Sequence, residues 1–294
     1  MTNRINVCFC IDNNYVSQLG AVLYSLIDSN SMNEVRVYVI SSDVLEVSKE
    51  SLSEIIKKIE NFSIEFIDVF DKNLLSLEAG GHISSATFIR FSIPELLNSI
   101  DKVLYLDADL IIKDDLVKFW DVDLEDSYVC AVDNPLFGRY ESLFMDDDWG
   151  YFNAGVMIMN LPLWRKDNIK EQALEFLSGH KDVAIMFDQD ALNSVMHGKW
   201  IKADIRWNLQ TVFLRKKRDL ILDFKELNDS ISNPGIIHYS TSSKPWQLLD
   251  PHPLRYCYLE NEEKFQKVPR IYKGFFKSIV RYIYVRLVFA YQGL

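Results

Sequence analysis

Two carboxylates stand one residue apart at the end of an apolar run. Asp107 and Asp109 flank Ala108, after the run Val103–Leu106 and before the run Leu110–Ile112. An unpaired carboxylate at the end of a buried strand is strongly destabilising, so a bound cation is the simplest compensation. Carboxylate oxygens are the ligands that Mg²⁺, Mn²⁺ and Ca²⁺ prefer. The segment therefore predicts a metal site at the C-terminal edge of a sheet.

The same Asp-x-Asp spacing recurs elsewhere in the sequence, and its context separates the cases. Asp121–Asp123 and Asp146–Asp148 lie in polar, turn-like surroundings that are typical of solvated loops. Asp188–Asp190 precedes a helical pattern, where one aspartate is expected as a cap and the second exceeds what capping needs. Asp107 and Asp109 are the stronger metal candidates because they follow a strand-like run.

Polar residues follow other strand-like runs as well. Asp12 and Asn14 come after the first run, and Asp133 follows a later one. In parallel sheets the carboxyl ends of the strands form the ligand-binding edge. Asp12 has two interpretations: it caps the helix that follows, or it receives a nucleobase together with Asn14.

A histidine, a lysine and an arginine complete the candidates. His238 ends a strand-like run, where a lone histidine is usually structural. Beside a carboxylate pair, however, it can complete a Mn²⁺ shell, and Lys244 can neutralise a phosphate. Arg90, on a helical pattern after the Gly80–Gly81 turn, is either a solvated surface residue or a partner of acidic or phosphate groups.

Strand-like and helical segments alternate along the chain. Helical spacing is found at Tyr15–Ile27, Leu52–Ile59 and Ile169–Leu177, and Thr87–Leu97 predicts a helix despite Pro94. Such alternation predicts an α/β fold, with a mostly parallel sheet and helices on both faces. The sequence contains no glycine-rich phosphate loop, so a nucleotide must be held in another way. The strand-like runs are Ile5–Ile11, Val35–Ile40, Ile64–Val69, Val103–Leu106, Tyr128–Val132, Val156–Met159 and Ile236–Tyr239.

Composition narrows the class of protein. The 294 residues carry a net charge of -10, which argues against nucleic acid as the main partner. The 4 dispersed cysteines include no Cys-x-x-Cys pair and predict neither a disulfide scaffold nor a zinc site, and Cys8 and Cys10 are expected as buried thiols. The sequence shows no signal-peptide pattern and no stretch long enough for a transmembrane helix, so we expect a cytoplasmic location.

The charge is unevenly distributed. The stretch from Lys264 to Leu294 contains seven lysines and arginines and no acidic residue, with aromatic and aliphatic residues among them. This pattern favours a helix on an anionic membrane surface over a packed C-terminal helix or a solvated tail. We therefore expect a catalytic domain over residues 1–263 and a tail over residues 264–294 that binds the inner face of the cell membrane peripherally.

Four sequence blocks together resemble glycosyltransferase family 8, and their spacing is closest to bacterial lipooligosaccharide α-galactosyltransferases. The resemblance runs from about Ile5 to Trp246. It implies a Rossmann-like GT-A fold and retaining transfer of galactose or glucose from a UDP-sugar. The implied acceptor is a glycan, such as lipopolysaccharide or another cell-surface glycolipid. The blocks are Leu104–Asp109, Tyr151–Val156, Asp188–Asn193 and His238–Trp246.

The resemblance also implies roles for individual residues. Asp107, Asp109 and His238 match the Mn²⁺ ligands, with Mg²⁺ as the alternative ion, and Asp12 and Asn14 match residues that hold the uracil. The expected catalytic positions are Asp188 and Gln189. The residues expected around the donor are Cys10, Asp12, Asn14, Arg90, Asp107, Ala108, Asp133, Asn153, Asp188, Gln189, Thr241 and Lys244, and His82 lies near the expected acceptor entrance.

Two departures from the family pattern concern the diphosphate loop and the acceptor. Ser240–Ser243 replaces a Gly-Pro element before Lys244, and Thr241 cannot offer a bare glycine backbone. The stretch Asp133–Trp149 differs from the family type, which leaves the choice of acceptor open.

Retention at the anomeric carbon leaves two mechanisms. A double displacement needs a carboxylate nucleophile on the far face of the sugar, and Asp188 is the only nearby one that the pattern supplies. In a front-face reaction the acceptor hydroxyl attacks on the side of the leaving group. The amide of Gln189, where a nucleophile is expected, favours the front-face reaction.

Two other functions compete with sugar transfer. A metal-dependent phosphatase would use Asp107 and Asp109 but leaves His238–Trp246 and Asp188–Asn193 without a role. A non-catalytic sugar-nucleotide or glycan-binding protein would need fewer of the residues that are present. The sequence indicates no oligomeric state.

Overall fold

The computed structural model describes residues 4–71, 74, 85–134, 138–215, 224–248, 250–266, 283 and 287. The chain divides into two compact units. Unit 1 comprises Met1–Asn14, Met32–Asp107 and Val117–Asp204, and unit 2 comprises Tyr15–Ser31, Ala108–Leu116 and Ile205–Leu294.

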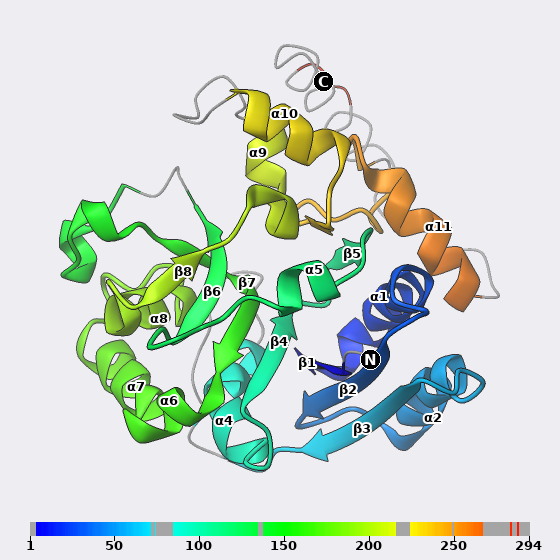
Figure 1. Ribbon diagram of the computed structural model, residues 1–294, viewed down its shortest axis with the longest axis horizontal. Helices are drawn as coiled ribbons and strands as arrows, with labels where there is room; N and C mark the ends of the chain where they lie inside the picture. The colour runs from blue at the N-terminus through cyan, green and yellow to red at the C-terminus, as the bar shows by residue number, and fades with distance from the viewer. Residues whose placement is uncertain are drawn as a thin grey trace. The chain divides into compact units, whose positions relative to one another are not determined.

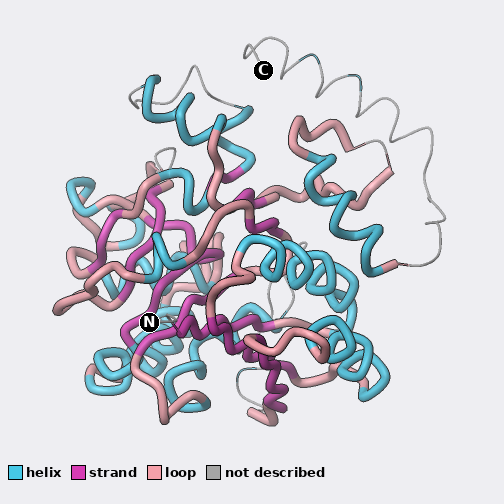
Figure 2. The backbone as a smooth tube through the Cα atoms, turned by 45° about the vertical axis from the view of Figure 1, so that its right-hand side comes forward, coloured by secondary structure: helices cyan, strands magenta, loops and turns pink. Residues whose placement is uncertain are grey.

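Unit 1 contains a seven-stranded mixed sheet in the order β3-β2-β1-β4-β7-β6-β8 (Figure 1). The pairs β3–β2, β2–β1, β1–β4 and β6–β8 are parallel, whereas β7 is antiparallel to both β4 and β6. Figure 2 shows the strands running beside one another with helices next to them. The strands are β1 (Arg4–Cys10), β2 (Glu34–Ser41), β3 (Phe62–Asp68), β4 (Lys102–Leu106), β6 (Val129–Asp133), β7 (Phe152–Asn160) and β8 (Trp200–Lys202).

The central strands are apolar on both faces, as expected for strands covered on both sides. In β4, Val103 to Leu106 are all buried, and β7 is buried from Ala154 to Met159. The helical elements of unit 1 are α2 (Glu46–Ile56), η2 (Ser85–Ser92), α4 (Ile93–Leu96), α5 (Val117–Trp120), η3 (Glu141–Leu143), η4 (Asp147–Trp149), α6 (Leu161–Lys166), α7 (Ile169–Gly179) and α8 (Asp188–Met196).

The segment around Pro94 departs from the expected single helix. Ser85–Ser92 forms the 3₁₀-helix η2, and the short α-helix α4 begins at Ile93. Pro94 lies in the first turn of α4, where a missing N–H leaves no hydrogen bond unmade. Proline therefore marks the start of the α-helix and does not interrupt it.

Unit 2 is built on a small sheet in the order β5-β10-β9. β5 (Leu110–Ile112) pairs antiparallel with β10 (Ile236–His238), which pairs parallel with β9 (Leu209–Gln210). The helical elements of unit 2 are α1 (Val16–Ser29), which follows the turn η1 (Asn13–Tyr15), η5 (Ile205–Asn208), α9 (Thr211–Arg215), α10 (Phe224–Ser232) and α11 (Arg255–Phe265).

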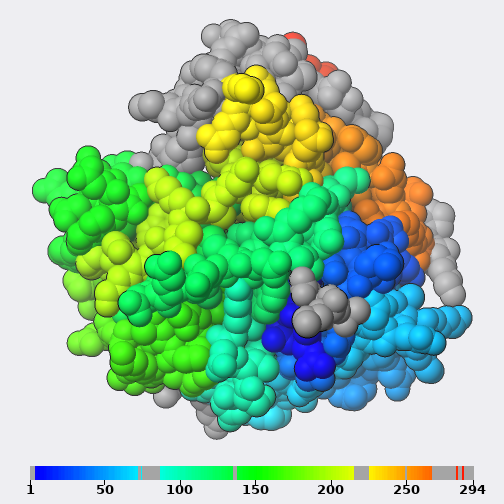
Figure 3. Space-filling model, viewed as in Figure 1, coloured from blue at the N-terminus to red at the C-terminus, as the bar shows by residue number. Residues whose placement is uncertain are grey.

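Helix α11 lies against α1 (Figures 1 and 3). Gly20 permits the close approach, because a Cβ atom there would lie 2.6 Å from the ring of Phe265. The ion pair of Lys264 with Asp28 and the hydrogen bond of Gln266 with Ser17 connect the same two helices. The last turn of α11 is thereby fixed to the body of unit 2.

All seven strand-like runs predicted from the sequence are strands. The predicted tail beyond Gln266 lies outside the described residues, apart from Ile283 and Leu287. Its membrane role and the boundary at residue 264 therefore stay predictions. Among the described residues, none of the helices has the length and apolar character needed to span a membrane.

Candidate metal and sugar-transfer site

The carboxylate pair lies on the short link between strands β4 and β5. Asp107 follows β4, and its N–H donates to the Gly155 carbonyl at 2.8 Å. Asp109 immediately precedes β5, and its own carbonyl accepts the Tyr239 N–H at 2.9 Å. Backbone hydrogen bonds on either side of Ala108 thus fix both residues. The look-alike residues Asp121–Asp123 and Asp146–Asp148 lie in loops and a short turn, with their aspartates exposed.

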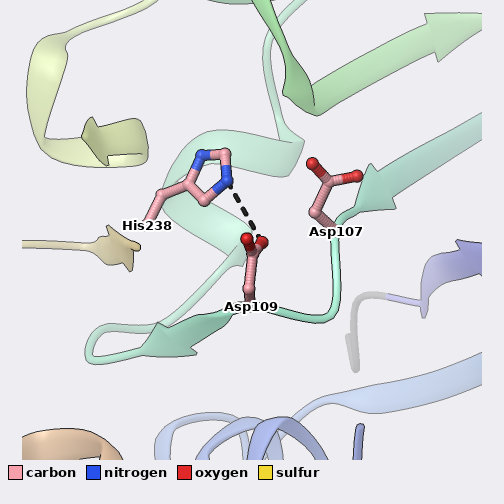
Figure 4. A group of neighbouring side chains, drawn as sticks. All are labelled: Asp107, Asp109 and His238. Atoms are coloured by element: carbon pink, nitrogen blue, oxygen red, sulfur yellow. Dashed lines mark ion pairs between the residues drawn. The ribbon is translucent and has the colours of Figure 1, made fainter. Parts of the chain in front are cut away.

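Strand β10 brings His238 to Asp109. His238 is paired with Leu110 in the sheet register, one residue beyond Asp109. Its Nε2 lies 3.2 Å from Asp109 Oδ1 (Figure 4), and its Nδ1 lies 2.9 Å from Asn208 Oδ1. Because an amide oxygen accepts, Nδ1 carries the proton in the neutral ring and Nε2 presents its lone pair. The Nε2 lone pair of His238 and the Oδ1 atom of Asp109 face each other, so both can bind the same metal ion.

Asp107 is the third candidate ligand. One ligand atom each of Asp107, Asp109 and His238 lies within 4.8 Å of the others (Figure 4). Two carboxylate oxygens and an imidazole nitrogen suit Mn²⁺. Asp109 Oδ1 is buried without a hydrogen-bond partner. A buried carboxylate oxygen with no donor is strongly unfavourable, and a cation would relieve it. The residues present therefore fit the predicted metal.

Lys244 contacts the second oxygen of Asp109. Its Nζ donates to Asp109 Oδ2 and, at 2.7 Å, to the Tyr239 carbonyl. Burial opposes ionisation of Asp109, whereas the Lys244 ammonium favours it, and the pKa of that carboxyl lies below its usual range. The predicted diphosphate lysine and two predicted metal ligands thus form one cluster. In the serine-rich loop before Lys244, Thr241 Oγ1 donates to the Ser243 carbonyl at 3.2 Å.

Unit 1 contains a buried arginine that is paired with two carboxylates. Arg90 is 5% exposed and donates from Nη2 to Asp107 Oδ1 at 3.1 Å, while its Nη1 lies 3.1 Å from Asp188 Oδ2. The sequence left open whether Arg90 is solvated or paired, and the structure places it between two acidic residues. Burial raises the pKa of Asp188, although Arg90 opposes this, and the carboxylates around Arg90 raise the pKa of its guanidinium despite burial.

Gln189, at the start of α8, has its side-chain amide fully engaged on the oxygen side. Gln189 Oε1 accepts the Asn153 Nδ2–H and the Ala154 N–H, both at 3.0 Å. Gln189 Nε2 donates to the Tyr151 hydroxyl at 3.0 Å. The chain reaches α8 through Phe187, whose φ of 47° is uncommon for a bulky residue. The predicted pair Asp188 and Gln189 is thus adjacent to the predicted residues Arg90 and Asn153.

Four residues that the sequence did not assign to the site support these side chains. Asp190 is fully buried and accepts the Tyr151 O–H at 2.6 Å and an Arg139 N–H at 3.0 Å. Asn208 orients His238. Tyr151 lies within a recognised block and Asp190 within an Asp-x-Asp triplet, so a signal was present for these two. Arg139 and Asn208 have no motif that could have revealed them.

The remaining predicted residues lie near the ends of β1 and β6. Asp12 Oδ1 accepts the Asn14 N–H at 2.8 Å in the turn η1, whereas the N-cap of α1 is Tyr15, which makes no side-chain capping bond. A role of Asp12 in base binding stays a prediction. Asp133 Oδ1 accepts the Tyr151 N–H at 3.1 Å, and its Oδ2 lies 2.7 Å from Lys202 Nζ. Cys10 is a half-buried free thiol at the end of β1. His82 lies outside the described residues.

Comparison with known proteins gives a consistent result. The family model described as glycosyl transferase family 8 matches residues 6–249. General stress protein A of Bacillus subtilis (strain 168) is 33% identical over 261 residues, covering 85% of this chain and 90% of that protein. The lipopolysaccharide 1,3-galactosyltransferase of Salmonella typhimurium (strain LT2) is 27% identical over 274 residues, covering 88% of this chain and 77% of that protein.

A solved structure of similar fold extends the likeness to three dimensions. The galactosyltransferase LgtC, in complex with donor and acceptor sugar analogues, superposes with a TM-score of 0.81 at 27% identity. The match covers 90% of this chain and 98% of that one. The predicted GT-A fold is thereby confirmed, as a mixed, mostly parallel sheet flanked by helices. The chain belongs to glycosyltransferase family 8.

Proposed function

We propose that this glycosyltransferase moves a hexose, galactose or glucose, from a UDP-sugar to a glycan acceptor with retention of anomeric configuration. The carrying observation is the group of Asp107, Asp109 and His238, whose ligand atoms lie within 4.8 Å of one another. We assign Mn²⁺ to this group, with Mg²⁺ as the alternative. Bound there, the ion supplies Lewis-acid stabilisation of the charge that develops on the diphosphate leaving group.

The chain's own residues contribute binding and electrostatics. Lys244 adds a positive charge beside Asp109, and this suits it to the diphosphate. Arg90 keeps Asp188 paired within the buried cluster of unit 1. Removing one partner of such a buried pair typically costs about 3–5 kcal/mol. The pair with Arg90 should therefore hold Asp188, and the adjacent Gln189, in place.

The hydrogen bonds of Gln189 support the front-face reaction. Both lone pairs of Gln189 Oε1 are occupied by N–H donors, so this oxygen is poorly placed to act as a nucleophile. Asp188, the alternative nucleophile, is ion-paired with Arg90 and 4% exposed. Attack by the acceptor hydroxyl on the leaving-group side needs neither side chain as a nucleophile. A covalent glycosyl adduct on Asp188, detected by mass spectrometry of the enzyme with donor alone, would overturn this mechanism.

For the acceptor we propose a class of molecule. The named function of the Salmonella typhimurium relative and the sugar analogues bound to LgtC support a glycan acceptor, and lipopolysaccharide or a related glycolipid is the proposed class. The proposed location is the inner face of the cell membrane, reached through the basic C-terminal tail.

A panel of UDP-sugars with Mn²⁺, scored by UDP release, tests the proposal. We expect release from UDP-galactose or UDP-glucose that chelation abolishes. Asp109→Asn should abolish release, whereas Asp121→Asn, a substitution in an exposed look-alike triplet, should not change it. Binding of a UDP-sugar without turnover would indicate a binding protein. Metal-dependent phosphate release from phosphoesters would indicate a phosphatase.

A further inference from the structure

A chain of buried hydrogen bonds ends on the amide of Gln189. Arg139 Nη2 donates to Asp190 Oδ2 at 3.0 Å, and the Met186 N–H donates to the same oxygen at 2.8 Å. Tyr151 donates its O–H to Asp190 Oδ1 at 2.6 Å. Tyr151 and Asp190 have no exposed surface, so neither side chain is placed to meet a substrate in solution.

The polarity of each bond fixes the direction of the next. An ionised carboxylate only accepts, so the hydroxyl proton of Tyr151 points to Asp190 and its oxygen remains an acceptor for Gln189 Nε2. Burial and the Asp190 carboxylate raise the pKa of Tyr151 well above its usual range, which keeps that proton in place.

The other side of the amide has the opposite polarity. The Ala154 backbone N–H can only donate, and it lies 3.0 Å from Gln189 Oε1. A flipped amide would set its NH₂ against this N–H and its oxygen against the Tyr151 oxygen, whose proton is committed elsewhere. One orientation of the Gln189 amide is therefore favoured over the other.

We propose that Tyr151 is a positioning residue for sugar transfer, which fixes the orientation of the Gln189 amide and is itself held by Asp190 and Arg139. The inference rests on the proposed function, in which Gln189 lies beside the donor sugar. In its fixed orientation Gln189 presents an N–H, not its oxygen, to any remaining neighbour. The donor sugar is thus met by a hydrogen-bond donor of defined direction.

Tyr151→Phe removes the hydroxyl and keeps the ring. We expect kcat for transfer to fall about 10- to 100-fold, the range typical of lost orientation, with little change in the donor KM. Tyr128→Phe is a matched control, because Tyr128 immediately precedes β6 as Tyr151 precedes β7, is also buried, and donates to Asp167 Oδ2 at 2.8 Å. It should lower stability to a similar degree and leave kcat unchanged.

A double-mutant cycle separates positioning from general damage. If Tyr151 acts through Gln189, Tyr151→Phe should have no further effect on kcat in a Gln189→Ala background. The same fold-loss in both backgrounds would overturn the inference. So would an unchanged kcat in the single variant.

A second measurement does not depend on turnover. The side-chain NH₂ resonances of Gln189 can be assigned by their absence from Gln189→Ala. They should shift or broaden in Tyr151→Phe and stay in place in Tyr128→Phe. Unchanged resonances in Tyr151→Phe would overturn the inference, whether or not the wild-type protein is active. Absence of UDP release by the wild-type protein from every UDP-sugar would instead contradict the proposed function.

Discussion

Asn208 determines which nitrogen of His238 faces Asp109. Its Oδ1 accepts from His238 Nδ1 at 2.9 Å and leaves Nε2 directed at the carboxylate. Asn208→Ala should weaken Mn²⁺ binding about 10- to 100-fold, as loss of a ligand-orienting partner typically does. The measurement is titration of free Mn²⁺ by electron paramagnetic resonance. Asn261→Ala is the control, since Asn261 is likewise buried in unit 2 and, among the described residues, its side chain bonds to Cys257 and Lys264 of its own helix α11. Equal affinities for the two variants would contradict the prediction.

We expect Lys244 to compete with a bound cation for Asp109. Its Nζ donates to Asp109 Oδ2, an oxygen that a metal could use. Lys244→Met removes the charge and keeps the apolar stem. Mn²⁺ affinity of the donor-free protein should then rise about tenfold, equivalent to about 1.4 kcal/mol, while the KM for the UDP-sugar increases.

The two effects of Lys244→Met have opposite signs, so global damage cannot mimic them. Calorimetric titration of Mn²⁺ and steady-state kinetics measure them separately. Lys264→Met, which breaks an exposed ion pair with Asp28, should change neither quantity. A fall in Mn²⁺ affinity for Lys244→Met would show that Lys244 supports the ion and does not compete with it.

The sequence revealed the candidate metal ligands more clearly than the residues that orient the side chains of the site. Asp107, Asp109 and His238 belong to motifs with a chemical signature of their own. Asn208 and Tyr151 gain their roles from partners in other elements, which no spacing along the chain encodes. Asp12 had two interpretations, helix cap or base contact, and the residues alone could not choose between them; its observed bond lies in the turn η1 that precedes α1.

Among the elements, length decided what could be predicted. Apolar runs of four or more residues gave recognisable strands, as in β2 and β4. Strands β5, β8 and β9 have three residues or fewer and are too short to show a period of two. In the small sheet of unit 2, β10 was predicted from the run Ile236–Tyr239, whereas β5 and β9 were missed for this reason, although this sheet brings Asp109 and His238 together.

The approach to β10 depends on a glycine. Gly235 donates its N–H to the Arg206 carbonyl at 2.8 Å, and a Cβ atom there would lie 2.5 Å from the buried ring of Trp207. Gly235→Ala should therefore destabilise the protein by about 1–3 kcal/mol, as overpacking typically does. Because Trp207 adjoins Asn208 in η5, Mn²⁺ affinity should fall as well.

Urea unfolding of Gly235→Ala measures the first effect. Gly179→Ala is its control, because no described atom outside its chain neighbours and the backbone of α7 lies within 4 Å of the Cβ position at Gly179. That control should stay within about 1 kcal/mol of the wild type. If Gly235→Ala unfolds at the same urea midpoint as the wild type, the close contact of Gly235 with Trp207 does not limit the side chain at position 235.

For the whole molecule, charge separates the body from the tail. The chain has a net charge of -10, yet its last 31 residues, from Lys264, contain seven lysines and arginines and no acidic residue. We therefore expect anionic lipids to repel the acidic body and to attract the tail. Each basic residue near such a surface contributes about 1 kcal/mol, so membrane binding should depend on the tail and on salt.

Replacement of Lys273, Lys277 and Arg281 by glutamine tests this within the full chain. The variant should no longer sediment with phosphatidylserine vesicles at low salt, because about 3 kcal/mol of attraction is lost. Its UDP release should match that of the wild type, since Asp109, His238 and Lys244 are untouched. The control replaces Lys57, Lys58 and Lys181, outside the tail, by glutamine and removes the same charge. If both variants lose binding equally, the attraction comes from net charge and not from the tail.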